Sequence, residues 1–560
     1  MNRVLLTRNT EHCQRQRFLP LFVLLATGWW ANIAFGQEEA IFANDRFVFY
    51  KDRLETRDRG NAVYRSSDGR AITRNGHPHR TRNRFRQDKL YLQTPFPILD
   101  AAFALAVDET LGCIAPAGTK SAQLGPGKTG GIYHRRYYYL THGKDIREYT
   151  RDTAQHVQLG DSVIIDRDAA EGSIVRRFVF ENKRIREDYI VTADSVHLIS
   201  AVLEYYRITG DKGFLRNVWD CMWNEMIAKE AVRKKKDGLW LGSLWADHGS
   251  GFIEQEHFEN RNKHVKSLYA NTLVADAWKS LAEMADLLGF QGEKETAEQK
   301  YLELKTAINQ VLYRPELGTY CYYKYDVGDL YYDYRENVSA GLIYLAGVAD
   351  KKKTIAYHNR FTATPYGYRN VDPVIRKETE WMGGNVWDVQ EAYHAWALAR
   401  LNKGESLKDF IFWHARAGIV PNEWREGTIN PTTGKLNNNY KRFACSAMAY
   451  TSYWTRGIFG VTYEFGGIRF DPCVPPSFGD DFFAVLNNFT YREGSLRIIL
   501  RGQGYEVARV TLNGRKVATI PGEIKGKNTI EILMKNHVAI PVPEPVARAT
   551  VTNSDKPSTK

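Results

Sequence analysis

The chain has 560 residues, of which 43% are hydrophobic and 25% are charged, and its formal net charge is +12. This composition is typical of a globular protein with a large core, and it excludes a wholly disordered or fibrous chain. The basic residues are densest between Arg53 and Arg86. Such a segment suits an acidic polysaccharide or a solvated surface. No helix-turn-helix, zinc-finger or RNA-binding pattern indicates a nucleic acid partner.

The N-terminus predicts export. Basic residues up to Arg17 precede an apolar run over residues 18–30, which is short for a membrane-spanning helix. Small residues at Ala34 and Gly36 suit a signal peptidase, so we expect residues 1–36 to be a signal peptide and the mature protein to be secreted or periplasmic. An uncleaved anchor is the alternative. No later segment has the length and apolarity of a membrane span, so none is expected after signal cleavage.

The next segment, residues 37–94, is basic, polar and rich in turn residues, without a clear period. Helical patterns follow it, with apolar residues at helical spacing and glycines at the expected ends. Amphipathic helices joined by long loops predict stacked helical hairpins around one core. The helices are expected over residues 190–209, 271–288, 389–401 and 444–458, with Gly210 and Gly289 ending the first two.

Near Gly460 the pattern changes from helical to strand-like. Strands are expected over residues 496–501, 506–512 and 528–534, and Asn513-Gly514 predicts a two-residue hairpin turn. The last residues are rich in Pro, Ser, Thr and Lys, which predicts disorder. The expected domains after the basic segment are therefore a helical domain over 95–462, a small β module over 463–540 and a disordered tail over 541–560.

Two acidic loops carry the candidate chemistry. Asp247 and Glu423 each lie between helical stretches, and each has a tryptophan nearby, Trp245 and Trp424. A glycosidic bond is cleaved by one carboxylic acid that protonates the leaving oxygen and one carboxylate that activates water or attacks the sugar. Aromatic rings can stack on the apolar face of a sugar. Acids in loops are also often solvated surface groups, so the pattern alone leaves both interpretations open.

The order of several motifs resembles that of the six-hairpin glycosidases, namely the glucoamylase, trehalase and cellobiose phosphorylase relatives. Residues 467–476 (Gly-Ile-Arg-Phe-Asp-Pro-Cys-Val-Pro-Pro) are similar to the run where the toroid of that family meets its C-terminal sheet. Residues 245–247 (Trp-Ala-Asp) look like the loop that supplies the general acid, and residues 383–387 (Gly-Gly-Asn-Val-Trp) look like a Gly-Gly-x-x-Trp segment. The resemblance covers residues 95–535. It implies a mainly α fold, an (α/α)6 toroid of helical hairpins with a small C-terminal β-sandwich-like module.

The resemblance also implies roles for single residues. Asp247 matches the general acid of the cellobiose phosphorylases. Glu423 lies in a segment that looks like the base segment of glucoamylases, and Glu426 is the fallback base. The pair implies an inverting hydrolase, with no cofactor and no metal. The residues expected to bind substrate are Arg151, Asp152, Asp194, Trp245, His248, Trp387, Trp424 and Arg425, while Glu380 and Trp381 are expected to line the pocket.

Each of these assignments has a structural alternative. Arg151 and Asp152 could form an ion pair at a helix start, Asp194 could cap its helix, and the tryptophans could simply fill the core. The expected partner is an oligo- or polysaccharide. A polysaccharide lyase, a disaccharide phosphorylase and a carbohydrate-binding protein without activity are the rival classes. The cysteines are scattered and show no zinc-binding spacing.

Overall fold

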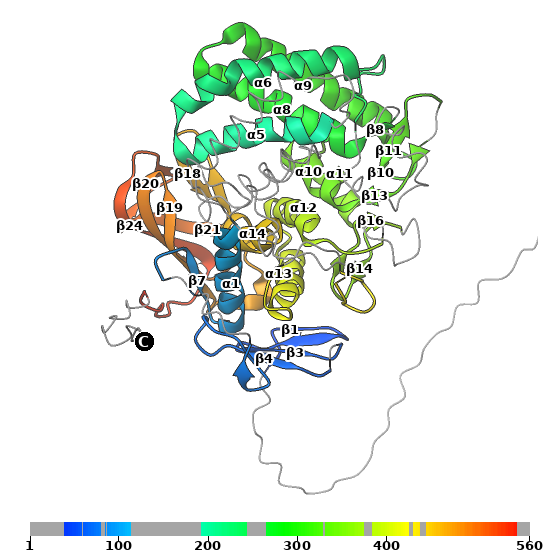
Figure 1. Ribbon diagram of the computed structural model, residues 1–560. Helices are drawn as coiled ribbons and strands as arrows, with labels where there is room; N and C mark the ends of the chain where they lie inside the picture. The colour runs from blue at the N-terminus through cyan, green and yellow to red at the C-terminus, as the bar shows by residue number, and fades with distance from the viewer. Residues whose placement is uncertain are drawn as a thin grey trace, which may run out of the picture. The chain divides into compact units, whose positions relative to one another are not determined.

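The structure is a computed structural model. It is rich in helices and contains several small sheets (Figure 1). It describes residues 39–58, 60–79, 85, 87–113, 192–242, 265–328, 331–373, 384–424, 429–436 and 444–545.

Several helices that are far apart in the sequence pack against one another in space (Figure 1). Because each helix contacts the next, they form a continuous run of neighbours. In order of contact, the run is α1 (Pro97–Cys113), α14 (Ala444–Ser452), α12 (Asp388–Arg400), α10 (Asn337–Leu345), α8 (Leu268–Leu288) and α5 (Thr192–Thr209).

A second set of helices packs on this run, and each of them contacts the helix that precedes it in the chain. These consecutive pairs agree with the helical hairpins that the sequence predicts. The second set consists of α6 (Lys212–Arg233) on α5, α9 (Gln291–Ala307) on α8, α11 (Lys351–His358) on α10 and α13 (Gly404–Ile419) on α12.

The helices begin and end close to the predicted positions. Ser267 caps α8 by accepting a hydrogen bond from the backbone of Ala270, and Gly289 ends the helix with a left-handed φ of 81°. Gly210 follows α5 with a φ of 74°, and Asp211 caps α6. The last predicted helix is α14, which continues as the π-helix η6 (Tyr453–Ile458).

An antiparallel sheet occupies the segment for which the sequence showed no period. Its strands have two to four residues, too few for a clear alternation of apolar and polar side chains. The ring of Phe42 stacks on that of Phe412 in α13, with 4.9 Å between the ring centres. The sheet is therefore attached to the helices by apolar contacts. Its strands are, in order, β1 (Phe42–Ala43), β2 (Phe47–Phe49), β3 (Arg53–Thr56), β4 (Val63–Arg65), β5 (Thr73–Arg74) and β6 (His77–Pro78).

The C-terminal strands form a second six-stranded sheet, and the three predicted strands are confirmed. Asn513 and Gly514, with φ values of 50° and 80°, make the predicted hairpin turn between β21 and β22. An unexpected edge strand, β7, comes from the N-terminal region. In spatial order the strands are β22 (Arg515–Lys516), β21 (Gln503–Leu512), β24 (Lys525–Asn536), β20 (Glu493–Arg501), β19 (Phe483–Tyr491) and β7 (Tyr91–Gln93).

The remaining short elements connect these parts. They comprise the short helices η5 (Ile308–Leu312) and η7 (Pro476–Phe478), the sheet β17 (Val461–Tyr463), β18 (Gly467–Phe470) and β23 (Ile520–Pro521), the sheet β12 (Tyr331–Tyr332), β11 (Tyr323–Tyr325) and β8 (Val265–Ser267), and the pairs β9 (Tyr313–Arg314) with β10 (Thr319–Tyr320), β13 (Arg335–Glu336) with β16 (Val371–Asp372), and β14 (Ala363–Thr364) with β15 (Gly367–Tyr368).

The motif at residues 467–476 packs where the helices meet these strands. Cys473 is fully buried, and its backbone NH donates to the carbonyl oxygen of Gly457 in η6 at 3.3 Å. Gly467 lies so close to the backbone of Ile520 in β23 that a side chain there would clash. The motif therefore has a structural role in joining the helices to the β strands.

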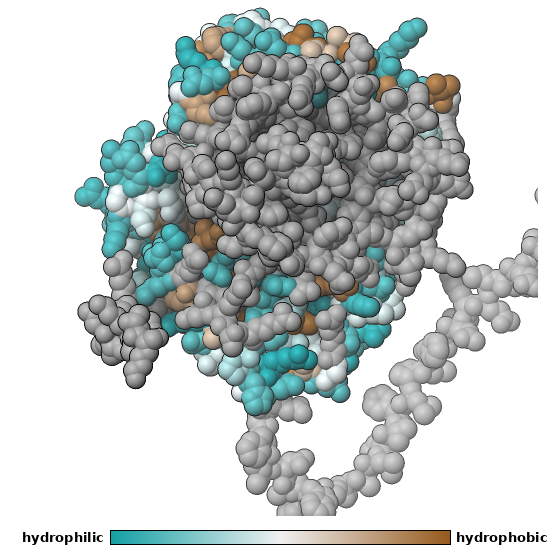
Figure 2. Space-filling view, in the orientation of Figure 1, coloured by the Kyte–Doolittle hydropathy of each residue, from teal (hydrophilic) through white to brown (hydrophobic). Residues whose placement is uncertain are grey.

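Few large apolar side chains are exposed among the described residues. On the face drawn in Figure 2, the described residues around the N-terminal strands and the C-terminal sheet are mainly hydrophilic. Large exposed apolar side chains, such as Val327 and Val232, occur singly, which is normal. Among the helices in the described ranges, none combines the length and apolarity needed to cross a membrane.

The contact between α10 and α12 gives a test of the helix packing. Gly341 in α10 lies against the backbone of Tyr393 and His394, so an added Cβ would overlap it. We expect Gly341→Ala to lower the free energy of unfolding by about 1–3 kcal/mol or more, because the helices must separate. Gly292→Ala in α9, where an added Cβ meets nothing within 4 Å, should raise it by up to about 1 kcal/mol. Urea unfolding of both variants checks this, and equal effects would contradict the packing.

Candidate active site

Glu423 lies in a turn whose backbone is fixed by hydrogen bonds. The turn follows α13 and has the pattern of a Schellman motif: Glu423 NH donates to Gly418 O at 3.1 Å, and Asn422 NH donates to Ile419 O at 3.1 Å. Asn422 takes the left-handed conformation, with a φ of 57°. Asparagine tolerates this conformation better than most residues. The helix therefore ends at Ile419, and the turn that follows it leads directly to the candidate base.

The N-terminal segment holds the same turn from outside. The side-chain amide of Asn422 donates to the carbonyl oxygen of His79 at 2.5 Å. His79 Nε2 lies 3.0 Å from Ile419 O and 3.2 Å from Val420 O, so this ring nitrogen carries the proton and donates. Both side chains are buried. The segment that looked like a basic extension thus positions the backbone of Glu423.

Trp424 anchors the other side of Glu423. Its ring is only 1% exposed, and it packs against Tyr450 of α14 with 5.3 Å between ring centres. The ring also lies against Gly418, where a Cβ would clash with it. Glu423 itself is half-buried, between two buried neighbours. The backbone of Glu423 is therefore held on both sides by buried residues.

The predicted Gly-Gly-x-x-Trp segment, residues 383–387, pairs with the chain that follows Glu423. Val386 and Ile429 exchange two backbone hydrogen bonds, of 3.0 Å and 2.8 Å. Trp387, 2% exposed, is the N-cap residue of α12. Of the three tryptophans predicted to bind substrate, the two within the described ranges, Trp387 and Trp424, are therefore packed inside the protein. Their role as a platform for a sugar remains a prediction.

Three buried polar residues that no sequence pattern indicated contact one another between α12, α13 and η6. Glu391 of α12 lies 2.5 Å from His414 Nε2, and Tyr453 OH lies 2.5 Å from His414 Nδ1. Burial raises the pKa of Glu391 well above its usual range and lowers the pKa of His414 to about 4. Both directions favour a neutral pair, in which the protonated carboxyl donates to the imidazole. Because these side chains are sealed from solvent, their role is structural.

Asp388 is the buried acid that follows Trp387. Its Oδ1 accepts hydrogen bonds from Ser446 Oγ at 2.8 Å and from the backbone NH of Val389 at 2.9 Å. Burial raises its pKa to about 6 despite these bonds. One sequence feature indicated that Asp388 is important, because this acid directly follows the Gly-Gly-x-x-Trp segment. Its contacts join the starts of α12 and α14.

Most of the predicted site residues lie outside the described ranges. Asp194 lies in the first turn of α5, but its side chain is not among those described. Within the described residues, Glu423, Trp387 and Trp424 are thus the predicted site residues whose side chains are placed, and no group of acidic, histidine or cysteine residues there has the arrangement of a metal site. The residues outside are Asp247, Arg151, Asp152, Trp245, His248, Arg425, Glu426, Glu380 and Trp381.

Comparison with known proteins identifies the class. Residues 245–440 match the family described as the mannosylglycerate hydrolase MGH1-like glycoside hydrolase domain. The matched range begins at Trp245 and contains both Asp247 and Glu423. The chain therefore contains a glycoside hydrolase family domain. Within that class, residues 245–440 form an MGH1-like domain. No curated protein matches the sequence.

Solved structures share the fold. A sialidase is 14% identical, with a TM-score of 0.55, and the match covers 77% of this chain and 41% of the sialidase. A rhamnosidase of family GH78 from Bacillus sp. GL1 is 13% identical, with a TM-score of 0.53, and the match covers 80% of this chain and 44% of the rhamnosidase. The chain thus spans about two fifths of the length of these proteins. The likeness at this level of identity concerns the fold alone.

The neutral state of His414 predicts a dependence of stability on pH. In the unfolded chain this imidazole takes up a proton near its ordinary pKa of 6.5, whereas the folded protein resists protonation until about pH 4. The unfolded state therefore binds more protons between pH 6.5 and 4, and stability falls as the pH is lowered through that range. The contribution of one such group is at most about 1.4 kcal/mol per pH unit.

We expect His414→Gln to flatten this slope, as measured by urea unfolding at steps from pH 7.5 to 4. Asp388 and Glu391 act in the opposite sense, because a raised carboxyl pKa makes stability fall as the pH rises above about 4. The comparison with the wild type must therefore be made at each pH. His537→Gln, at an exposed position, is the control and should leave the slope unchanged. A His414→Gln variant with the full slope of the wild type would contradict a neutral His414.

Proposed function

We propose that the protein is an exported glycoside hydrolase that cleaves a glycosidic bond in an oligo- or polysaccharide with inversion. Asp247 is the general acid in this proposal, and Glu423 is the general base. The observation that carries it is the family match, because the matched range contains both acids. The rigid turn around Glu423 supports its role, since catalytic groups are held by packed neighbours.

The two acids have different tasks in this mechanism. Asp247 donates a proton to the leaving oxygen as the bond from the sugar carbon breaks. Glu423 removes a proton from the water that attacks the same carbon from the opposite face. An inverting pair needs roughly 6.5–9.5 Å between its carboxyl groups, to leave room for this water. Arg425, two residues after Glu423, favours the ionised base in this proposal.

The remaining predicted residues complete the proposed sugar site. Arg151 and Asp152 grip the terminal sugar through charge-assisted hydrogen bonds to its hydroxyl groups. The basic segment rich in arginines favours an acidic glycan, and the name of the matched family adds glycosides of glycerate to the substrates to be tested. The other proposed contacts are Asp194, Trp245, His248, Trp387 and Trp424.

We also propose that the run of neighbouring helices closes into an (α/α)6 toroid. The order of contacts from α1 through α14, α12, α10 and α8 to α5 supports this, because each inner helix of such a ring contacts the next. The likeness in fold to the GH78 rhamnosidase supports it as well. The domain boundaries proposed with the toroid are residues 95–462 for the helical part and 463–540 for the β module.

Replacing either proposed catalytic acid should abolish most of the activity. We expect Asp247→Asn and Glu423→Gln to lower kcat by about 10²–10⁴ on the best substrate, the usual contribution of a general acid or base. The assay measures release of reducing sugar from plant, algal and host glycans and from mannosylglycerate. Glu493→Gln, at an exposed position far along the chain in β20, is the control and should keep full activity.

If both variants retained the activity of the wild type, the site assignment would be wrong even if the protein hydrolyses glycosides. Proton NMR of the first-formed anomer tests the mechanism separately. Inversion gives the anomer opposite to that of the substrate, and retention would contradict the pairing of Asp247 with a water-activating Glu423. Products that absorb in the ultraviolet would indicate a lyase, and turnover that requires phosphate would indicate a phosphorylase.

We further propose that residues 1–36 direct export and are removed. The basic start, the short apolar run and the small residues before Gln37 support this. N-terminal sequencing of the protein from the periplasm and medium of the producing cells should give Gln37 as the first residue. Protein found only inside the cell with its first residues intact would contradict export.

A further inference from the structure

The chain after Glu423 contains a turn, residues 430–434, whose shape is fixed by its own residues. The side chain of Asn430 accepts hydrogen bonds from the backbone NH groups of Thr432 and Thr433, at 3.0 and 2.9 Å. The NH of Gly434 donates to Asn430 O at 2.9 Å. These bonds determine the shape of the 430–434 turn, but they do not determine where it lies on the protein.

The N-terminal segment lies against this turn. Gly434 has a left-handed φ of 65°, and a Cβ on it would lie 2.6 Å from Asp58 Oδ2 and 2.6 Å from the ring of Tyr366. Asp58 follows strand β3, and Tyr366 lies between β14 and β15. Glycine allows this contact, because any other residue would place a side chain where the two groups are.

Arg416 of α13 joins these residues from the helix side. Its Nη2 donates to Asp58 Oδ2, and its Nη1 lies 3.5 Å from Gly434 O. The OH of Tyr366 donates to the same carboxylate oxygen at 2.7 Å, and the guanidinium carbon lies 4.7 Å from the centre of the Tyr366 ring. The side chains of Arg416 and Asp58 are only 4% and 2% exposed. Three separate segments of the chain thus meet at one buried carboxylate.

A buried ion pair of this kind is better explained by its geometry than by stability. Taking both charges out of water is costly, and apolar side chains of similar volume are often as stable. A guanidinium and a carboxylate, by contrast, bind in a narrow range of orientations. Asp58 and Arg416 are therefore suited to holding the 430–434 turn at one place on α13.

We propose that Asp58, Arg416 and Tyr366 are positioning residues for Glu423. None of the three contacts the substrate in this proposal. They act by holding the 430–434 turn, which limits where the chain that leads to it from Glu423 can run. The proposal rests on the proposed function, because it takes Glu423 to be the general base.

The N-terminal segment then holds the chain on both sides of the proposed base. Before the base, the amide of Asn422 donates to His79 O, and after it, Gly434 lies against Asp58. A catalytic group must be held within about 0.5 Å of its productive position, which two anchors achieve better than one. Asp58 and His79 lie outside residues 245–440, so both anchors come from a part of the chain that the family match does not cover.

Asp58→Asn tests the proposal directly, since it removes the charge with almost no change in volume. We expect kcat on the best substrate to fall about 10- to 100-fold, because a misplacement of about 1 Å costs on the order of 10²-fold. KM should stay within about twofold of the wild type, since substrate binding is not involved. Asp52→Asn is the matched control. It removes another N-terminal carboxylate that pairs with two arginines, Arg53 and Arg65, each at 3.3 Å, and should leave both constants unchanged.

Gly434→Ala tests the same contact without removing a charge. The added Cβ would press on Asp58 and Tyr366, so kcat should fall by a similar factor. Gly526→Ala is the matched control, because Gly526 has nearly the same φ, 66°, but an added Cβ there meets nothing within 4 Å. Both variants strain the backbone to a similar degree, and only the first should lower kcat. Tyr366→Phe removes the hydroxyl alone and should lower kcat roughly 3- to 10-fold.

A double variant distinguishes positioning from general damage. If Asp58 acts through Glu423, adding Asp58→Asn to Glu423→Gln should lower kcat no further, because the base is already absent. Circular dichroism and the midpoint of thermal unfolding show whether each variant is folded. Asp58→Asn leaves the charge of Arg416 buried without its partner. If that variant does not fold, Gly434→Ala and Tyr366→Phe carry the test with both charges in place.

Three results would overturn the proposal. The first is a wild-type kcat in the folded variants at Asp58, Tyr366 and Gly434. The second is a raised KM with an unchanged kcat, which would place the effect in substrate binding. The third is a double variant in which the two single losses multiply, because Asp58 would then act independently of Glu423.

Failure of the proposed function would look different. Wild-type activity in Glu423→Gln would refute the base assignment, whatever Asp58→Asn does. Wild-type activity in Asp58→Asn beside an inactive Glu423→Gln would refute the positioning role alone.

Discussion

The turn after α13 is the constraint on which the candidate site depends. Its backbone is closed by two hydrogen bonds to the helix end, and His79 holds it from the N-terminal segment while Trp424 anchors it in the core. The left-handed conformation of Asn422 costs about 1 kcal/mol, which the bond from its amide to His79 offsets. Glu423 is carried by this turn. The N-terminal sheet is therefore part of the machinery that positions the proposed base.

Burial separates structural acids from candidate catalytic acids in this protein. Glu391 is fully buried, and its two oxygens contact His414 and the backbone NH of Tyr368, so its neutral form is stabilised and no substrate can reach it. Glu423, by contrast, is only half-buried and lies in a loop. The buried acids hold α12 against α13 and α14, whereas Glu423 lies in the turn after α13.

The sequence predicted those features that depend on local patterns. The ends of α8 and the turn at Asn513-Gly514 follow from a capping serine and from residues that accept positive φ, so short stretches of sequence determine them. The strands before residue 80 were missed, because two to four residues are too few to show a period. The bond between Asn422 and His79 joins residues 343 positions apart, and no local pattern reports such a contact. Glu423 could be proposed from its loop, but what holds it there could not.

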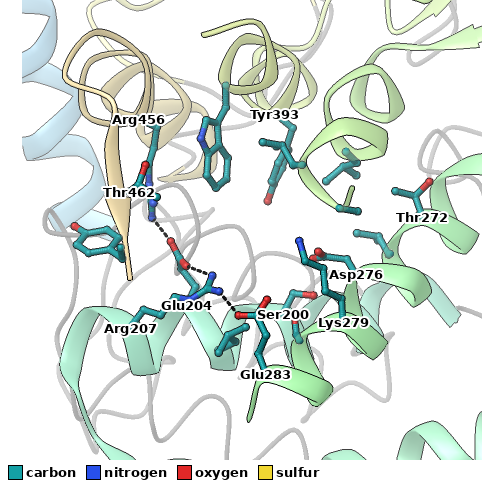
Figure 3. Close-up of a pocket in the computed structure, with 18 residues that line it drawn as sticks. Ser200, Glu204, Arg207, Thr272, Asp276, Lys279, Glu283, Tyr393, Arg456 and Thr462 are labelled. Atoms are coloured by element: carbon teal, nitrogen blue, oxygen red, sulfur yellow. Dashed lines mark hydrogen bonds and ion pairs between the residues drawn. The ribbon is translucent and has the colours of Figure 1, made fainter. Parts of the chain in front are cut away.

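The ion pairs that join Glu204 and Arg207 of α5 to Arg456 of η6 and Glu283 of α8 are hard to explain by stability alone (Figure 3). Taking charged groups out of water costs several kcal/mol per ion, and well-packed apolar residues in place of a buried pair are often as stable or more so. Arg456 is 1% exposed and Glu204 7%, so both bear that cost. The end of α5, by contrast, has a plain structural account: Thr209 Oγ bonds to Tyr205 O, and Asp211 caps the next helix. The fold of α5 and α8 therefore does not by itself require these buried charges.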